Sequence, residues 1–282
     1  MSEVLVGTAS SEYLTVSNQV LNNNATVTDV DYTDLTAAVA SSWNAKGEKS
    51  VSIDSDKSNI YVQDFVDVSV NADSDTGANV TVVNAKRGSI ETGNGDDSVY
   101  LSVYSNNNHW SNSFDIDTGA GDDTVVLTNT ANSENTSFHI ELGSGNDSLD
   151  VSGLLDPFSS ASRFADGGDG LDTLTLSGED SVSFDNFEVI KGSDSAFSTV
   201  VTLSSDLLED NDSAELGLVF NQVDLQLSDD VSVSDVNVIS DDQASYLASL
   251  GLDSSDYVSV EVAGDDGTYT VLTDDSDYSI IA

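Results

Sequence analysis

The sequence contains no cysteine and only seven basic residues, against 51 acidic ones, and its formal net charge at pH 7 is −44 over 282 residues. Without cysteine the chain has neither disulfides nor thiolate metal sites. A nucleic-acid interface needs a basic patch, which seven dispersed cations do not supply. The same charge disfavours direct adhesion to anionic lipid unless a metal ion bridges the two. We therefore expect no nucleic-acid partner and no insertion into a membrane.

Long apolar runs are also missing. No run approaches the roughly 20 residues that a membrane-spanning helix needs. Residues 1–6 lack a basic stretch followed by an apolar one, so we expect no cleaved secretory signal at this end.

The signatures of several enzyme classes are absent as well. The two histidines, His109 and His139, form no His-x-x-x-His pair, which excludes the zinc-protease motif. No Gly-x-Ser-x-Gly segment is present, so the nucleophile elbow of lipases is missing. A sugar epimerase or lyase would need clustered basic residues and tyrosines, and the basic residues do not cluster. Acidic pairs are too frequent to indicate a glycosidase. We expect the protein not to be an enzyme.

The composition lies close to that of an unfolded chain, because hydrophobic residues make up 38% and the net charge is extreme. The apolar residues are nevertheless gathered in short β-branched runs, such as residues 80–83 and 124–127. Such a chain folds if its carboxylates are neutralised, and a hard divalent cation with oxygen ligands would do this.

Four similar glycine-rich segments mark the centre of the chain. They are Thr92–Val99, Thr118–Val125, Leu142–Leu149 and Gly167–Leu174. Their second glycines, Gly95, Gly121, Gly145 and Gly170, are separated by 26, 24 and 25 residues. So regular a spacing indicates an internal repeat.

Within one period, a glycine turn is followed by an apolar run, a polar stretch and a second apolar run. Residues 124–128, 129–135 and 138–142 are an example, and the alternation in both apolar runs predicts strands. Each period therefore predicts one coil of a solenoid, which must stack on its neighbours to bury its apolar face. Further strands of the same stack are predicted at 58–64, 67–71 and 79–85, with 72–78 as a degenerate turn. Downstream, Phe184–Gly192 predicts a strand leading to a fifth, weaker turn.

We predict an all-β fold: a parallel β-roll or β-solenoid with coils of about 25 residues and calcium-binding Gly/Asp turns, flanked by two caps. Residues 1–49 would form a small mixed N-terminal cap with a short helix over 33–45. Residues 50–200 would form the calcium-stapled solenoid. Residues 201–282 would form a β-rich C-terminal region, with a helix over 241–250 and a hairpin of 257–262 and 268–272 around an Asp-Gly turn.

The glycine turns have the chemistry of a calcium site. Glycine permits a positive φ, so that backbone carbonyls can face a cation, and the aspartate adds a carboxylate. Calcium takes six to eight oxygens, more than one turn supplies. Two turns stacked at strand spacing, about 4.8 Å, can pool their oxygens. Four turns then predict three sites between turns; the alternative is a Gly/Asp turn without metal.

The four segments resemble the nonapeptide Gly-Gly-x-Gly-x-Asp-x-U-x, with U a large apolar residue, of repeats-in-toxin proteins. The resemblance implies a parallel β-roll that binds several calcium ions, with Asp97, Asp123, Asp147 and Asp172 as ligands. Two departures from the family pattern stand out. The first glycine survives only as Gly167, and one motif occurs per roughly 25 residues instead of in tandem. We infer a wider coil with calcium along one edge, nearer to surface-layer members.

Carried over to this chain, the motif places carboxylates and backbone carbonyls of fourteen residues around calcium. They are Thr92, Asn94, Asp96, Asp97, Thr118, Ala120, Asp122, Asp123, Leu142, Ser144, Asp147, Gly167, Asp169 and Asp172. Of these, Asp96 and Asp122 are either outer ligands or solvated carboxylates.

The resemblance also implies export by type I secretion through an uncleaved C-terminal signal, and the acidic tail 274–282, ending in small and apolar residues, is similar to such signals. We expect a secreted bacterial protein of the cell surface. Its function would be that of a calcium-binding structural protein that assembles with copies of itself into a surface layer, filament or extracellular matrix, with cell-surface polysaccharide as a further partner. The alternative is a calcium-dependent adhesin or carbohydrate-binding module, with Trp43, Trp110 and Tyr104 as stacking residues.

Overall fold

The computed structural model describes the strands within residues 3–28 and then residues 50–54, 59–63, 65, 67–72, 74–103, 112–129, 136–154, 163–178, 182–193, 199–212, 214 and 216–275. Side chains are described from residue 52 onward.

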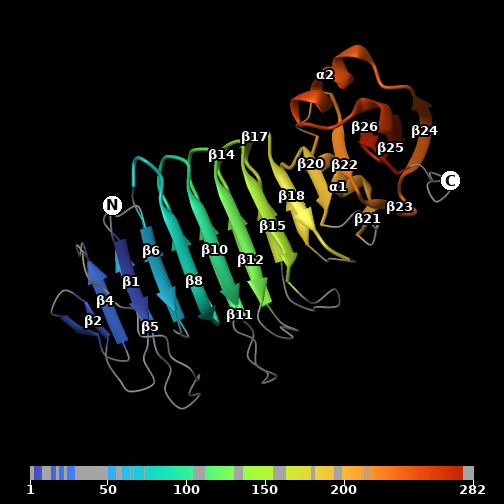
Figure 1. Ribbon diagram of the computed structural model, residues 1–282. Coiled ribbons are helices and arrows are strands. Elements are labelled where there is room, and N and C mark those ends of the chain that lie inside the picture. The colour runs from blue at the N-terminus through green and yellow to red at the C-terminus, as the bar shows by residue number, and fades with distance from the viewer. Residues whose placement is uncertain are drawn as a thin grey trace.

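Two sheets, dominated by parallel pairing, make up most of the fold (Figure 1). The long sheet has twelve strands, in the order β1 (Glu3–Gly7), β6 (Asn59–Gln63), β8 (Asn79–Ala85), β10 (Ser98–Val103), β12 (Thr124–Asn129), β15 (Ser148–Gly153), β18 (Thr173–Leu176), β20 (Val189–Gly192), β22 (Leu218–Asn221), β26 (Thr268–Thr273), β25 (Val258–Ala263) and β24 (Ser232–Asn237). The short sheet has eight strands, in the order β19 (Ser183–Asp185), β16 (Arg163–Asp166), β13 (Thr136–Glu141), β11 (Asn112–Asp117), β9 (Arg87–Glu91), β7 (Asp67–Asn71), β5 (Ser50–Asp54) and β4 (Asn24–Thr28).

From β5 to β20 the chain alternates between the two sheets. We call the segment from one strand of the long sheet to the next one along the chain a circuit. Equivalent residues of successive circuits pair in register: Val99 with Val125, Val125 with Leu149, and Leu149 with Leu174. Because strand side chains alternate between faces, each strand turns its apolar residues toward the other sheet and its polar residues outward.

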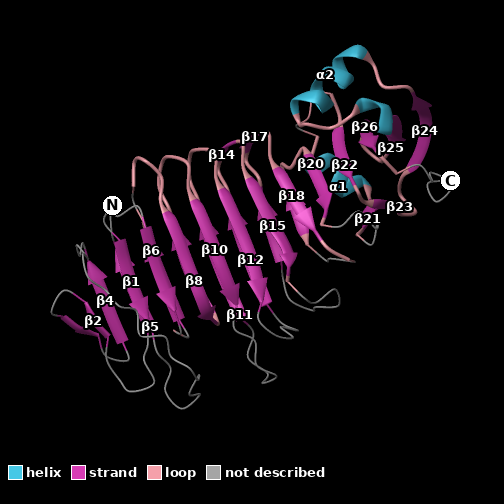
Figure 2. Cartoon of the chain, viewed as in Figure 1, coloured by secondary structure: helices cyan, strands magenta, loops and turns pink. Residues whose placement is uncertain are grey.

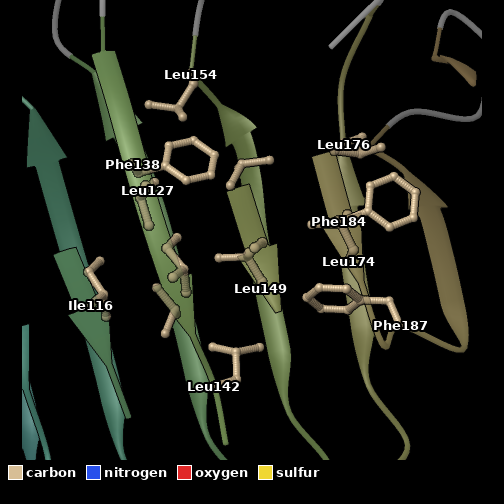
Figure 3. Close-up of a cluster of buried hydrophobic side chains, with 14 of the residues drawn as sticks. Ile116, Leu127, Phe138, Leu142, Leu149, Leu154, Leu174, Leu176, Phe184 and Phe187 are labelled. Atoms are coloured by element: carbon tan, nitrogen blue, oxygen red, sulfur yellow. The ribbon is translucent and has the colours of Figure 1, made fainter. Parts of the chain in front are cut away.

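The core lies between the two sheets and runs along the whole stack. Figure 3 shows side chains from both sheets filling this space, among them Ile116, Leu127, Phe138 and Leu149. Near the end of the stack the rings of Phe184 and Phe187 meet edge to face, with centroids 6.2 Å apart. Burying each of these large side chains contributes about 1.5–3 kcal/mol, so stacking, and not any single circuit, holds the fold.

The C-terminal part of the chain closes one end of the stack (Figures 1 and 2). Strand β21 (Val200–Leu203) pairs with β23 (Asp224–Leu227), and the helix α1 (Ser205–Asp210) lies between them in sequence. The antiparallel strands β24, β25 and β26 complete the long sheet. The helix α2 (Asp241–Ser249), fixed by a capping box between Ser240 and Gln243, and the 3-10 helix η1 (Ser254–Asp256) lie between β24 and β25 in sequence.

Two further short pairs complete the strands that the structure describes. Strand β2 (Leu14–Val16) pairs antiparallel with β3 (Gln19–Leu21), and β14 (Ser144–Gly145) pairs parallel with β17 (Asp169–Gly170). No helix among the described residues is long and apolar enough to cross a membrane.

The prediction of a mainly β fold with parallel sheets is confirmed. Strands β6, β7 and β8 match the predicted strands at 58–64, 67–71 and 79–85, and α2 and the hairpin β25–β26 match the predicted elements. The predicted helix over 33–45 lies outside the described residues.

The prediction of one strand over Phe184–Gly192 is wrong. The chain turns at Asn186, whose φ is 57°, and only resumes as a strand at Val189. The side chain of Asn211 fixes this turn by accepting a hydrogen bond from the backbone N–H of Phe187 at 2.9 Å. The fifth turn therefore lies inside the predicted strand, and its position is set by a residue 24 positions further along the chain.

Candidate metal site in the glycine turns

The four glycine turns stack directly on one another at one edge of the two sheets. Asn94 is bridged to Ala120, Ala120 to Ser144, and Ser144 to Asp169. The backbone N–H groups of Ala120, Ser144 and Asp169 donate to the carbonyls of Gly93, Gly119 and Gly143 at 3.1, 2.9 and 2.8 Å. The turns thus continue the strand ladder around the edge of the stack.

Glycine at the fourth position of each turn is a steric requirement of this stacking. Gly145 has φ 145° and Gly170 has φ 151°. A Cβ atom on Gly145 would lie 1.8 Å from the carbonyl oxygen of Gly121, and one on Gly170 would lie 1.5 Å from that of Gly145. Gly77, in the predicted degenerate turn 72–78, has φ 88° and approaches Asp96 in the same way, so this turn belongs to the same stack.

The motif aspartates form a buried column, which we call the inner column: Asp97, Asp123, Asp147 and Asp172. Each is at most 3% exposed. One carboxylate oxygen, Oδ1, of each residue accepts a hydrogen bond from the backbone of the preceding turn. Asp123, Asp147 and Asp172 accept from the N–H groups of Asp97, Asp123 and Asp147, each at 2.7 Å. Asp97 accepts from the N–H of Ala78 in the degenerate turn.

The series continues with a fifth buried acidic residue, which was not predicted from the sequence. Glu188, in the turn after Asn186, is 3% exposed, and its Oε2 accepts from the N–H of Asp172 at 2.7 Å. Glu188 directly precedes Val189, which pairs with Thr173 in the neighbouring strand. The signal in the sequence was an acidic residue just before an apolar strand, without the glycines that mark the other turns.

The second oxygen, Oδ2, of every inner-column aspartate is buried and has no hydrogen-bond partner. In Asp172 this atom lies 3.0 Å from the position that a Cβ on Gly167 would take, so it faces the first residue of its own turn. A buried carboxylate oxygen without a partner costs on the order of 1–3 kcal/mol, and more when the group is charged. A proton or a cation beside these four Oδ2 atoms would offset that cost.

Burial also changes the pKa values of three of these carboxyl groups. Burial raises the pKa of Asp123 to about 7, that of Asp147 to about 6 and that of Asp172 to about 7. The backbone hydrogen bonds to these carboxylates oppose the shift, and neighbouring carboxylates add to it. Asp123, Asp147 and Asp172 therefore bind a proton at a higher pH than an exposed aspartate does.

Threonine replaces the first glycine of the motif in two turns and forms a hydroxyl ladder. Thr92 Oγ1 donates to the carbonyl of Thr118 at 2.9 Å, and Thr118 Oγ1 donates to that of Leu142 at 2.7 Å. Thr118 is fully buried. Threonine at the first position of these turns thus provides an additional link between circuits.

Three exposed polar residues of the turns, Asp96, Asp122 and Asn146, form a separate outer column. Asp96 Oδ1 accepts from the N–H of Asp122 at 3.1 Å, and Asp122 Oδ1 accepts from the N–H of Asn146 at 2.8 Å. These bonds reach the following turn, whereas those of the inner column reach the preceding one. Asp96 and Asp122 therefore link turns, a role beyond the two alternatives of outer ligand and solvated carboxylate.

The short sheet carries a row of acidic residues that was also not predicted from the sequence. Glu91, Asp117, Glu141, Asp166 and Asp185 are paired in register on adjacent strands. Burial first, and then the charges of Glu141 and Asp115, raise the pKa of Asp117. Four of these residues directly precede a glycine turn, which is a signal that the sequence carries. The repulsion along the row destabilises the stack unless cations screen it.

All fourteen predicted residues lie in the four stacked turns, but their oxygens are not equivalent. The carbonyls of Ala120 and Ser144 accept hydrogen bonds from the N–H groups of Gly95 and Gly121 at 2.6 and 2.8 Å. No three His, Asp or Glu side chains of the described residues gather closely enough to hold a metal ion by themselves. A cation here would combine a carboxylate with backbone oxygens. Hard oxygen donors with orphaned carboxylate atoms fit calcium.

No family model, curated protein or solved structure matches this chain. The turns are therefore the basis of any functional assignment.

Of the other candidate residues, the structure describes only His139. Trp43, Tyr104, His109 and Trp110 lie outside the described residues. The ring of His139 stacks on Phe164 with centroids 5.2 Å apart, and its Nε2 lies 3.1 Å from Glu141 on the exposed face of the short sheet. The His139–Glu141 contact lies within β13, and the ring contact joins β13 to β16, so both are surface contacts.

Proposed function

We propose that this chain is a secreted, calcium-stabilised β-solenoid that acts as a structural subunit, assembling with copies of itself into a surface layer, filament or extracellular matrix. The observation that carries the proposal is the inner column, with its four buried carboxylate oxygens in a line and without hydrogen-bond partners. A catalytic role is not part of the proposal.

Calcium is the cation that the inner column favours. Its charge would offset the burial of the carboxylates, and its preference for oxygen matches the donors present. Asp97, Asp123, Asp147 and Asp172 would hold the ions, together with backbone carbonyls of the turns. When bound, calcium supplies charge neutralisation and a link between turns.

Calcium binding would be coupled to folding. The stacked turns exist only in the folded state, so an ion that binds them stabilises that state by mass action. Extracellular calcium modules bind at about 10⁻⁴–10⁻³ M, well above cytoplasmic levels of the free ion. With a net charge of −44, the chain would repel itself before export and fold on meeting calcium outside the cell.

The make-up of the described part of the chain supports the proposal of a structural role. Almost all of it is scaffold: two sheets, their shared core and a C-terminal closure. The long sheet ends in the edge strand β24, whose Val236 is 44% exposed, and Val238 just beyond it is 90% exposed. Copies of so acidic a protein repel one another, and calcium bridges between acidic surfaces would reverse that repulsion.

The test of assembly is light scattering and negative-stain electron microscopy on purified protein, titrated from chelator into millimolar calcium. We expect ordered sheets or filaments that appear with calcium and not with magnesium at the same ionic strength. A folded particle that remains monomeric at high concentration in millimolar calcium would contradict self-assembly. That outcome would favour the adhesin or carbohydrate-binding alternative, and a glycan array in calcium would then test it.

A further inference from the structure

Three polar residues of the C-terminal part lie in one row across adjacent strands: Lys191 of β20, Asn221 of β22, and Asp274 directly after β26. Lys191 pairs in register with Asn221. Phe220 pairs with Thr273, which places Asn221 level with Asp274 in the next strand. Neighbouring strands lie about 4.8 Å apart, so the lysine side chain is long enough to span the gap.

The row lies on the outer face of the long sheet. Ile190 and Phe220, one position earlier, are fully buried in the core between the sheets. Alternation therefore turns Lys191 and Asn221 to the opposite face, where both are partly buried. Beside them on this face is a second apolar cluster that includes Val189, Val219, Leu247, Tyr257 and Leu272.

Hydrogen bonds hold the side-chain amide of Asn221 between an acid and a phenol. Its Nδ2 donates to Asp274 Oδ2 at 3.2 Å and to the Tyr257 hydroxyl at 2.6 Å. The backbone N–H of Gln222 donates to both oxygens of Asp274, at 2.9 and 3.1 Å. Both the amide and the carboxyl group are thus fixed in the row that begins with Lys191.

Lys191 stands out in so acidic a chain. Within the described residues it makes no ion pair, although the chain carries 51 acidic residues. Arg87, by contrast, pairs with Asp67 at 3.0 Å on the short sheet. Ion pairing with a described residue therefore does not account for the placement of Lys191.

We propose that Lys191 and Asn221 form an intramolecular isopeptide bond, with Asp274 transferring the protons. The lysine ammonium first gives a proton to the Asp274 carboxylate, which leaves a neutral amine beside a carboxylic acid. Nζ of Lys191 then attacks Cγ of Asn221, and the Nζ–Cγ bond forms. Asp274 delivers its proton to Nδ2 and takes one from Nζ; the Cγ–Nδ2 bond breaks and ammonia leaves.

The reaction is balanced without any other reactant. An ammonium group and a primary amide become a secondary amide and an ammonium ion, and nothing is oxidised or reduced. Partial burial favours the neutral amine and acid over the charged pair. Consistent with this, burial raises the pKa of Asp274, against the lowering effect of the hydrogen bond from Gln222.

The bond would tie β20 to β22 across the excursion through β21 and α1. In a chain without cysteine it would do what a disulfide does elsewhere, closing a loop of about 30 residues and limiting the unfolded state. It would hold the C-terminal closure on the stack even when calcium is removed.

Intact mass spectrometry of the full chain, folded in millimolar calcium and then denatured, tests the proposal. We expect a mass below that of the sequence by one molecule of ammonia, and a branched proteolytic peptide containing Lys191 and Asn221. Lys191→Arg, Asn221→Ala and Asp274→Asn should each show the full sequence mass, whereas Lys86→Arg, a control between β8 and β9, should still lose ammonia.

Two results would overturn the proposal. One is a wild-type protein that circular dichroism shows to be folded and that nevertheless has its full sequence mass. The other is a loss of ammonia that persists in Lys191→Arg, because the bond would then involve other residues. Ammonia loss that persists only in Asp274→Asn would remove Asp274 from the mechanism. Since the readout is covalent, it is independent of whether the protein assembles.

Discussion

The two carboxylate oxygens of each inner-column aspartate have different environments. Oδ1 accepts a backbone hydrogen bond from the preceding turn, and Oδ2 is buried without a partner. A sequence motif identifies these aspartates, because glycine spacing fixes where the turn lies. The motif does not reveal which of the two oxygens accepts a hydrogen bond, because that depends on how the turns are offset along the stack.

Replacing Asp123 by asparagine should have opposite effects with and without calcium. An amide oxygen can still accept from the N–H of Asp97, while the buried charge disappears. In chelator we expect Asp123→Asn to unfold at a higher temperature than the wild type. Its free energy of unfolding should be larger by about 1–3 kcal/mol. In calcium we expect it to gain less stability than the wild type does. Thermal unfolding followed by circular dichroism measures both.

The matched control is Asp122→Asn, since Asp122 is exposed and the next turn already carries Asn146 at the equivalent position. Its effects should be smaller in both conditions. Equal behaviour of the Asp122 and Asp123 variants would show that burial of the inner column is not what matters.

The pH dependence in chelator should be the reverse of ordinary acid denaturation. The folded-state pKa values of Asp123 and Asp172, about 7, and of Asp147, about 6, lie above the unfolded value of about 3.9. The folded state therefore binds more protons between these limits, and stability falls as the pH rises from about 4 through about 7. Urea unfolding in chelator at several pH values measures the slope.

Repulsion among the other carboxylates also increases as the pH rises and also lowers stability, so a control is needed. The triple variant Asp123→Asn, Asp147→Asn, Asp172→Asn should have a flatter slope than the wild type. If its slope were unchanged, the inner column would not be the source of the pH dependence.

The glycine turn is the element that sets the distance between circuits. At Gly145 a Cβ atom would meet the carbonyl oxygen of Gly121 at 1.8 Å, and φ is 145°. We expect Gly145→Ala to destabilise the protein by more than about 3 kcal/mol and to weaken calcium binding, because both strain and displacement of the turn oppose it.

Gly267→Ala is the control for this substitution. Gly267 lies in the β25–β26 turn, and a Cβ atom there would meet nothing within 4 Å. Its stability should change by less than about 1 kcal/mol. Denaturant unfolding of the two variants in calcium compares them, and similar losses in both would mean that close packing of the turns is unimportant.

Elements with strong local signals were predictable from the sequence. Alternating apolar residues gave β7 and β8 their predicted bounds, and the Ser240–Gln243 capping pair accompanies a correctly predicted α2. The segment 184–192 was not predictable, because the side chain of Asn211 places its turn from a distance. The acidic row was visible as a residue before each turn, but its alignment required the register of the short sheet.

At the scale of the whole molecule, the fold is a stack of similar circuits in which each one contacts its neighbours. Such an arrangement adds like charges at every step, so acidic columns and rows extend along its length. The sequence predicted the stacking, since repeats and composition are properties of the whole chain. It did not predict the row of Lys191, Asn221 and Asp274, because residues 30 and 53 positions apart meet there only through the order of strands in the long sheet.

Calcium binding by the inner column is the central claim, and isothermal titration of calcium into chelator-treated protein, with circular dichroism on the same samples, tests it most directly. The comparison is between the wild type and a variant with all four inner-column aspartates replaced by asparagine. We predict that the wild type binds several calcium ions at submillimolar to millimolar concentrations and gains β-structure as it does so, and that the variant loses these ions. A wild type that is equally folded in chelator and binds no calcium up to several millimolar would contradict the account.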